Sequence, residues 1–149
     1  MKIFTFKSEL WLPQPRQDVF VFFADAGNLE TLTPPWLNFE ILTPLPIVMR
    51  VGALIDYKLK VRGVPIKWQT EITQWQPPFR FADQQNRGPY RQWLHEHRFE
   101  TKDNGTLCLD EVRYAVLGGW LVNFLLVRRD IQRIFEFRRQ KLLKIFGRK

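Results

Sequence analysis

The chain has 149 residues, a length that fits one domain with a full hydrophobic core, so we predict a single domain over residues 1–149. Apolar residues make up 45% of the sequence and aromatic residues 15%, which excludes an intrinsically disordered chain. The formal net charge of +8 predicts attraction to polyanions in general, and the single cysteine, Cys108, excludes an internal disulfide.

Two features predict a cytoplasmic protein without a transmembrane segment. The first residues alternate between apolar and polar side chains, whereas a signal peptide carries a continuous apolar run. The apolar stretch 120–127 is interrupted by Asn123 and is much shorter than the ~20 residues that span a bilayer.

The first third of the chain predicts a strand followed by two short helices. Residues 2–12 alternate with a period of two, as a strand does, and Pro13 ends the run. Pro15 suits the first turn of a helix, whose apolar residues keep helical spacing until Gly27 stops it. A shorter helix is expected over 29–32, and the prolines that follow it precede an extended run over 37–42.

The rest of the chain predicts antiparallel hairpins and then one long helix. Segments that alternate with a period of two lie between glycine and proline breakers, at 53–62, 64–75, 79–85, 90–101 and 106–116. Asn104-Gly105 is the strongest hairpin signal. After Gly118-Gly119 the apolar residues step by three and four, which predicts a helix of roughly 25 residues, about 37 Å long.

This order of elements predicts an α+β fold. About seven strands form one curved antiparallel sheet around the C-terminal helix, with two short helices after the first strand. Because a sheet curled around a helix rarely packs without a gap, we expect a cavity for an apolar small molecule between them.

The strand 90–101 carries both histidines of the chain on its expected inner face, with Trp93, His95, His97 and Phe99 in alternation. Two imidazoles within ~7 Å of each other can bind a metal or pass a proton. A zinc site needs a third protein ligand, and Asp110 is the only carboxylate that strand pairing brings near. We favour hydrogen-bonded histidines that support the core or orient a ligand, and we predict no metal and no cofactor.

The following strand adds two further candidates, Asp110 and Tyr114, which share one face. A buried Asp110 needs Arg, His or Tyr beside it, and His97 is the obvious partner. With His95, these residues form a candidate catalytic set for general acid and base chemistry in an aldol cyclisation or dehydration. A structural hydrogen-bond cluster that fixes strand register is the favoured alternative.

Alternation and loop position supply the remaining candidate ligand contacts. Trp36 and Met49 lie in loops flanked by proline, so we assign them to the mouth of the cavity, with the loop 44–52 as its gate. The full candidate ligand-binding set is Trp36, Met49, Tyr57, Leu59, Trp68, Thr70, Phe81, Trp93, His95, His97, Phe99, Phe124 and Ile131. Any one of these is more often plain core than ligand contact.

Four stretches resemble a bacterial branch of the START and Bet v 1-like (SRPBCC) superfamily: GVPIKW at 63–68, GPYRQWLHEHRF at 88–99, DEVRY at 110–114 and IFEFR at 134–138. The likeness runs from Leu10 to Leu143 and implies the helix-grip fold. That superfamily includes lipid, sterol and hormone carriers, polyketide cyclases and aromatases, and ring-hydroxylating oxygenase subunits. Membership therefore implies a hydrophobic ligand without naming it, and labels such as polyketide cyclase/dehydrase or coenzyme Q-binding are generic.

Three functions follow, in order of preference. The first is binding, transfer or presentation of a lipid, isoprenoid quinone or polyketide-like molecule, without catalysis. The second is a cyclase/dehydrase-type enzyme, and the third is a docking module whose basic helix contacts an anionic membrane or an acidic protein. Nucleic acid is not an expected partner, because the aromatic residues are predicted to point inward and the cations are dispersed.

The last helix is predicted to have two faces. Phe124, Ile131, Ile134, Phe135, Leu142 and Ile145 should pack into the sheet. Its exposed surface should be basic, with Arg128, Arg129, Arg133, Arg139, Lys141, Lys144, Arg148 and Lys149 against Asp130 and Glu136. A merely solvated face is the favoured interpretation of this charge.

Overall fold

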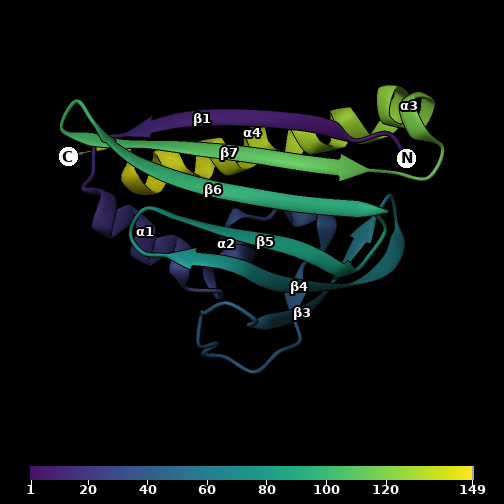
Figure 1. Ribbon diagram of the computed structural model, residues 1–149, viewed down its shortest axis with the longest axis horizontal. Helices are drawn as coiled ribbons and strands as arrows, with labels where there is room; N and C mark the ends of the chain where they lie inside the picture. Colours follow the sequence, from purple (N-terminus) through teal and green to yellow (C-terminus); the bar gives the residue numbers. More distant parts are fainter. Residues whose placement is uncertain (149) are drawn as a thin grey trace.

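The structure, a computed structural model, describes residues 1–148 and has the predicted α+β architecture (Figure 1). Its elements are β1 (Phe4–Leu12), α1 (Arg16–Ala24), α2 (Asn28–Leu32), the 3-10 turn η1 (Pro35–Leu37), β2 (Glu40–Ile41), β3 (Leu54–Val61), β4 (Val64–Gln76), β5 (Arg80–Arg87), β6 (Gln92–Lys102), β7 (Gly105–Ala115), α3 (Gly119–Val122), the π-helical turn η2 (Asn123–Val127) and α4 (Arg128–Phe146). The predicted curved sheet, long C-terminal helix and two short early helices are confirmed.

The seven strands form one antiparallel sheet in the order β1-β7-β6-β5-β4-β3-β2. Every neighbour in sequence is a neighbour in space except β1, which pairs with β7 so that Phe4 faces Tyr114. Register shifts interrupt the β4–β5 pairing after Gln69 and Ile72, and such irregularities bend a strand. Figure 1 shows α4 along the β1–β7 side of the sheet, with α1 and α2 on the same face.

Two hairpins are closed by residues with positive φ. Arg62 and Gly63 join β3 to β4, and Asp103 and Asn104 join β6 to β7, as a type I′ turn requires. The hairpin predicted from Asn104-Gly105 is therefore confirmed, but its two turn residues are Asp103 and Asn104. Gly105 begins β7, and a Cβ there would lie 2.4 Å from the Leu12 carbonyl oxygen, so close packing explains this glycine.

The core consists of two apolar clusters that lie toward opposite ends of α4. One surrounds Phe20 of α1, whose ring contacts the rings of Phe81 and Phe99 and whose cluster includes Leu142. The other contains Val112, Tyr114, Ile131 and Phe135. The sheet and α4 are thus held together at both ends and leave space between.

Two residues of the last helical segment that were predicted to pack into the sheet do not. Phe124 is 67% exposed and Ile145 is 43% exposed, whereas Ile131 and Leu142 are buried as predicted. The π-helical turn adds one residue before α4, so the buried position one turn earlier is Asn123 instead of Phe124. In the last turn of α4, Leu142 and Phe146 face the apolar cluster around α1, which leaves Ile145 on the outside.

Candidate functional site

A cavity of about 660 Å³ lies between the sheet and α4. This volume is typical of sites for small molecules. Strands β3 to β6 supply one wall, and α2, η1 and α4 supply the other. Most of the lining side chains are aliphatic or aromatic, so the space suits an apolar molecule.

The structure brings most of the predicted ligand contacts to this cavity. The lining includes Trp36, Met49, Tyr57, Leu59, Trp68, Thr70, Phe81, Trp93, His95, His97 and Ile131. Two predicted contacts are not in the lining. Phe99 is covered by the rings of Phe20 and Phe23, at centroid distances of 5.4 and 5.2 Å, and Phe124 points to solvent.

Five charged or titratable side chains meet beside the cavity, and we call them the charge cluster: Asp83, His95, His97, Asp110 and Arg138. All of them except Asp110 line the cavity. They come from β5, β6, β7 and α4. His95 lies directly opposite Asp83 in the sheet, and His97 lies opposite Asp110. The hydrogen bonds are nevertheless diagonal: His95 Nε2 is 2.7 Å from Asp110 Oδ1, and His97 Nε2 is 2.9 Å from Asp83 Oδ2.

This diagonal pairing brings the two imidazoles face to face. Their ring centroids are 3.6 Å apart with 27° between the planes, closer than the spacing expected from strand alternation. Phe81 stacks on the other side of His97, with centroids 4.1 Å apart. The two rings are therefore fixed in position by both hydrogen bonds and stacking.

Arg138 approaches the cluster from α4. Its Nη2 lies 3.4 Å from Asp110 Oδ1 and 3.4 Å from His97 Nδ1. The guanidinium also lies over the rings of Phe23 and Phe135, at 5.1 and 5.5 Å from their centroids. Its Nε is buried and has no hydrogen-bond partner among the described residues, so one donor of this cation is left free beside the cavity.

Tyr114 is not part of the charge cluster. Its hydroxyl donates to Asn123 Oδ1, and the side chain packs in the apolar cluster around Ile131 and Phe135. The predicted Asp-His-Tyr set is therefore not assembled. His97 was the predicted partner of Asp110. The closest histidine atom is instead His95 Nε2, at 2.7 Å, whereas His97 Nδ1 and Arg138 Nη2 each lie 3.4 Å from the same carboxylate oxygen.

Burial opposes charge on the two carboxyl groups and the two imidazoles of the cluster, and their neighbours decide which of these four groups keep a charge. Despite burial, Arg138 and the two histidines hold the pKa of Asp110 well below its ordinary value. Burial raises the pKa of Asp83, but the hydrogen bond from His97 and the nearby positive charge together outweigh burial, so the pKa lies below its ordinary value. Burial and the neighbouring imidazole lower the pKa of His95 to about 4.

His97 behaves in the opposite way. Burial lowers its pKa, but hydrogen bonds to Asp110 and Asp83 outweigh this and raise it. The cluster therefore favours two carboxylates balanced by the guanidinium of Arg138 and a protonated His97, with His95 neutral.

A second group of polar atoms, from Tyr57, Trp68 and Thr70, lies further along the sheet side of the cavity. The hydroxyl of Thr70 accepts from Trp68 Nε1 at 3.0 Å and lies 3.2 Å from the Tyr57 hydroxyl. Burial raises the pKa of Tyr57, so this phenol is neutral and can donate a hydrogen bond. The rings of Tyr57 and Trp68 stack at 5.8 Å and form a flat aromatic wall.

The ligand atoms of Asp83, His95 and His97 lie within 4.8 Å of one another, so the structure supplies the third metal ligand that the sequence lacked. Two histidines and one carboxylate suit several transition metals. Here, however, both Nε2 atoms are in hydrogen bonds to carboxylates, and Arg138 places a positive charge next to His97. That no metal or cofactor binds stays a prediction.

Asp83 and Arg138 are the site residues that the sequence reasoning missed. Both carried a signal. Asp83 follows Phe81 at the next inward position of its strand, and Arg138 lies seven residues after Ile131 and four after Ile134 on one helix face. The lining from α2 and η1, such as Leu29 and Leu37, had no comparable signal, because nothing in the sequence showed where these short helices pack.

A family model described as "Polyketide cyclase / dehydrase and lipid transport" matches residues 12–138. The chain belongs to this family. The match confirms the resemblance to the SRPBCC superfamily that the sequence motifs indicated. A comparison with curated proteins gives no match. No helix within residues 1–148 of this family member is long and apolar enough to cross a membrane.

Solved structures confirm the fold of this member of the polyketide cyclase/dehydrase and lipid transport family. Protein CV1439 from Chromobacterium violaceum is 14% identical, with a TM-score of 0.76 over 98% of this chain and 99% of that one. The Zhui aromatase/cyclase from Streptomyces sp. R1128 is 13% identical, with a TM-score of 0.70 over 97% and 96%. Ara h 8.0201 is 17% identical, with a TM-score of 0.66 over 96% and 99%. At these identities the likeness establishes the fold alone.

Proposed function

We propose that this protein binds a small hydrophobic ligand between the sheet and α4, and transfers or presents it in the cytoplasm. The observation that carries the proposal is the cavity of about 660 Å³ with its largely apolar lining. Membership of a family that includes lipid transport supports it. The candidate ligand classes are a lipid, an isoprenoid quinone or a polyketide-like molecule.

The polar groups of the cavity narrow the ligand class. Asp83, His95, His97, Arg138 and Thr70 line a cavity whose other lining residues are mostly aliphatic and aromatic, and the buried Arg138 Nε has no hydrogen-bond partner within residues 1–148. A buried donor gains most from an acceptor, because an unmade hydrogen bond costs about 1–3 kcal/mol. We therefore favour a mostly apolar ligand that carries a carbonyl or carboxylate oxygen.

A second candidate function is acid and base catalysis of the cyclase/dehydrase type. The observation that favours it is the pair of imidazole–carboxylate hydrogen bonds beside the cavity, His95 to Asp110 and His97 to Asp83. Turnover of a polyketide-like substrate that is lost in His97→Gln, while ligand binding persists, would support this function. Binding without turnover leaves the carrier function.

The proposed contact of the basic C-terminal helix with an anionic membrane would serve ligand exchange. Several of its cations are already engaged within the protein: Arg139 donates to the Glu9 carbonyl, and Arg133 lies over the ring of Trp36. Arg129 and Lys144 are exposed without such contacts among the described residues, whereas Lys149 lies outside them. The basic face therefore offers fewer free charges than the sequence suggested.

Native mass spectrometry of protein purified from its source, followed by extraction, tests the binding function and identifies the ligand. A fluorescence titration with anilinonaphthalene sulfonate measures access to the cavity. Ile134→Trp should abolish probe binding because Ile134 lines the cavity. The matched control Ile145→Trp makes the same change outside the cavity on the same helix, and should bind normally. A folded wild type that carries no apolar mass and binds no probe would contradict the proposal.

A further inference from the structure

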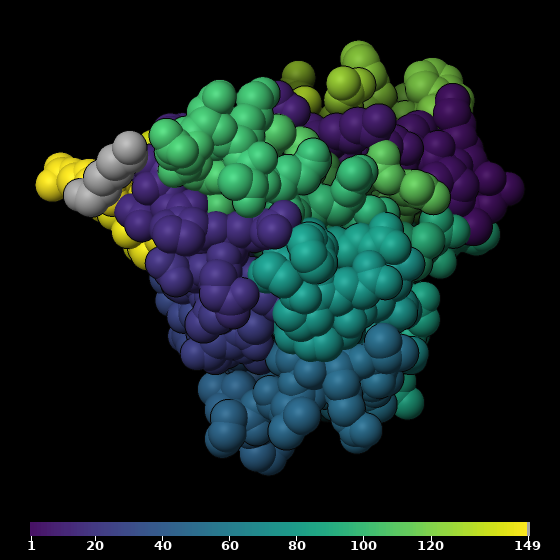
Figure 2. Space-filling view, turned by 60° about the vertical axis from the view of Figure 1, so that its left-hand side comes forward, coloured from purple at the N-terminus to yellow at the C-terminus, as the bar shows by residue number. Residues whose placement is uncertain are grey.

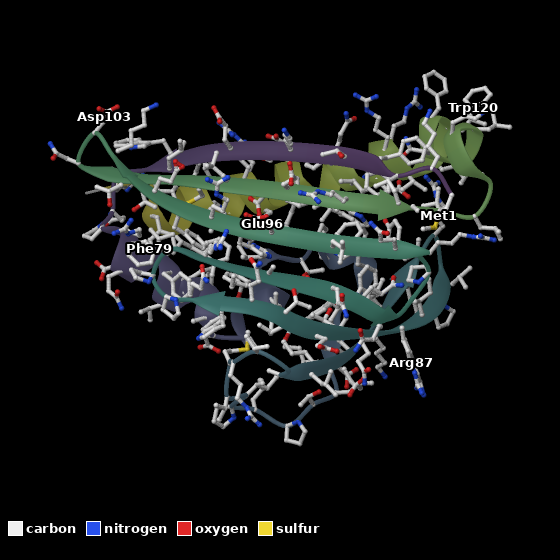
Figure 3. The ribbon with its side chains drawn as sticks, in the orientation of Figure 1. Met1, Phe79, Arg87, Glu96, Asp103 and Trp120 are labelled. Carbon is white, nitrogen blue, oxygen red and sulfur yellow. The ribbon has the colours of Figure 1, made fainter. Side chains whose placement is uncertain are left out.

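The segment after β7 exposes six large apolar side chains, which we call the apolar ridge. They are between 42% and 69% exposed: Leu117, Trp120, Leu121, Phe124, Leu125 and Leu126. Monomeric proteins rarely expose contiguous apolar surface of this kind unless it contacts a partner or a membrane. Figure 3 shows Trp120 at the outer edge of the molecule, pointing away from the sheet.

The backbone holds the ridge in this exposed position. Gly118 and Gly119 have φ values of 89° and 58°, which turn the chain away from the end of β7. The π-helical turn then directs the polar Asn123 inward, where its side chain accepts from the Tyr114 hydroxyl. Because Asn123 occupies the inner position, Phe124, Leu125 and Leu126 are directed outward.

Positive charge borders the ridge on two sides. Arg128 and Arg129 follow it directly, and no carboxylate occurs between residues 117 and 129. The next acid, Asp130, is paired with Arg62 at 2.9 Å. Lys2 lies at the same end of the sheet, since its ammonium is above the ring of Phe4 and Phe4 pairs with Tyr114. Figure 2 shows the yellow-green segment around residue 120 projecting next to the purple N-terminal residues.

An apolar projection with a cationic border matches the interface of an anionic bilayer. Tryptophan and other apolar side chains insert at the level of the headgroups, and each nearby Lys or Arg adds attraction to anionic lipid. A protein partner would need a matching groove, whereas a fluid bilayer adapts to side chains of any shape.

The ridge is continuous with the cavity. Leu117 belongs to both the ridge and the cavity lining, and Val122 and Val127 line the cavity from the same turns of helix. A bilayer that accepts the ridge would therefore lie next to Leu117, where the cavity lining reaches the exposed surface.

We propose that the apolar ridge inserts into an anionic bilayer and holds the end of the cavity at Leu117 against the lipid surface. The inference rests on the proposed ligand-binding function and gives the membrane contact a defined surface, the ridge with Arg128 and Arg129.

Flotation with vesicles of phosphatidylcholine and phosphatidylglycerol in equal parts tests the proposal. The wild type should float with these vesicles at low salt, and much less with vesicles of phosphatidylcholine alone. Phe124→Ser should reduce vesicle binding about tenfold, and Trp120→Ser/Phe124→Ser further, because each removes an inserted side chain. The matched control is Phe79→Ser, which removes an exposed phenylalanine away from the ridge and should bind like the wild type.

Further measurements separate the possible failures. Both ridge variants should keep the circular dichroism spectrum and the affinity for anilinonaphthalene sulfonate, since neither side chain lines the cavity. A wild type that binds the probe but does not float, or a Phe124→Ser protein that floats equally well, would overturn the proposed membrane insertion of the apolar ridge. The proposed ligand-binding function would not be affected. Self-association that Phe124→Ser abolishes, without flotation of the wild type, would assign the ridge to a second copy and also overturn the proposal. Flotation without probe binding would overturn the ligand function alone.

Discussion

The stacked imidazoles of His95 and His97 are too close for both to be protonated at low cost, because like charges at 3.6 Å repel strongly in a buried site. Their surroundings make them unequal. His97 contacts two carboxylates, Asp83 at 2.9 Å and Asp110 at 3.4 Å, whereas His95 contacts only Asp110. When only one of the two imidazoles is protonated, the proton is therefore on His97.

This asymmetry predicts two well-separated titrations. One imidazole should titrate above the ordinary histidine pKa of ~6.5 and the other near about 4. Because the chain has only two histidines, a pH titration followed by side-chain NMR yields one curve for each. His97→Gln should remove the upper curve. Two midpoints near ~6.5 would show that the rings do not interact as described.

The same shifts give the pH dependence of stability a definite sign. Because the pKa of His95 is lowered by folding, the unfolded chain takes up a proton first as the pH falls from ~6.5 toward about 4, and folding stability drops in that window. The raised pKa of His97 has the opposite effect: its contribution is complete below ~6.5 and is lost as the pH rises through its folded value. Urea unfolding at several pH values should show a flatter acid side for His95→Gln and a flatter alkaline side for His97→Gln.

Asp110 is the residue on which the charge cluster depends most. It accepts from His95 and faces both His97 and Arg138, so Asp110→Asn would leave a buried guanidinium without its counter-charge. We expect a loss of about 3–5 kcal/mol in the free energy of unfolding, measured by chemical denaturation. Asp103→Asn, the same change in an exposed turn where asparagine tolerates the positive φ, should stay within about 0.5 kcal/mol. Equal effects at the two positions would refute the assigned role.

At the scale of elements, the π-helical turn decides which side chains of the last helix face the sheet. Its anchor is the hydrogen bond from the Tyr114 hydroxyl of β7 to Asn123. Both side chains are buried, so removing one partner strands the other in an apolar environment.

A double-mutant cycle measures this anchor. Tyr114→Phe should lower the free energy of unfolding by about 1–3 kcal/mol, because Asn123 loses its buried partner. Tyr114→Phe/Asn123→Leu should recover part of that loss, since neither polar group then remains. Additive losses in the double variant would mean that the two side chains do not stabilise each other.

The same elements show how far the sequence could predict the structure. Strands and helices were predictable because their signals are local: the positive-φ turn at Gly63, the end of β1 before Pro13 and the alternation of β6 each involve a few neighbouring residues. The π-helical turn was not, because residues 119–146 keep a near-regular apolar spacing and the extra residue follows from the buried hydrogen bond of Asn123 to another element. Phe124 was misplaced for this reason.

The candidate site divides in the same way. Alternation along one strand predicted that His95 and His97 face inward together. It could not predict the diagonal bonds to Asp83 and Asp110, which depend on the register of three strands and on side-chain rotamers. Helical spacing from Ile131 and Ile134 put Arg138 on the inner face of the helix, but its approach to Asp110 depends on where α4 crosses the sheet, which no local pattern records.

For the whole molecule, the two apolar clusters toward either end of α4 hold the sheet and the helix together around a cavity at the centre of the fold. A ligand that fills this centre binds only the folded state and therefore stabilises it; at one hundred times its dissociation constant the gain is ~2.7 kcal/mol. Occupancy of the cavity should thus be visible in the thermal unfolding of the protein.

We expect removal of the bound ligand over a hydrophobic resin to lower Tm by ~5–10 °C. Ile134→Trp, whose indole occupies the ligand's space, should show the same Tm before and after this treatment, as measured by differential scanning calorimetry. A wild-type Tm that the resin leaves unchanged, although extraction shows that an apolar mass was removed, would mean that the ligand does not occupy the centre of the fold.

The pairing of β1 with β7 also constrains the order of events during synthesis. Phe4 finds its partner only when Tyr114 has been made, so the first strand leaves the ribosome long before it can join the sheet. Contacts between such distant residues form slowly, because a long loop must close before they are gained. Until α4 has also been made, the apolar inner faces of β3 to β6 are open to solvent and to other nascent chains, which makes aggregation a hazard. The protein's yield in the cell should therefore depend on chaperone supply more than its final stability would suggest.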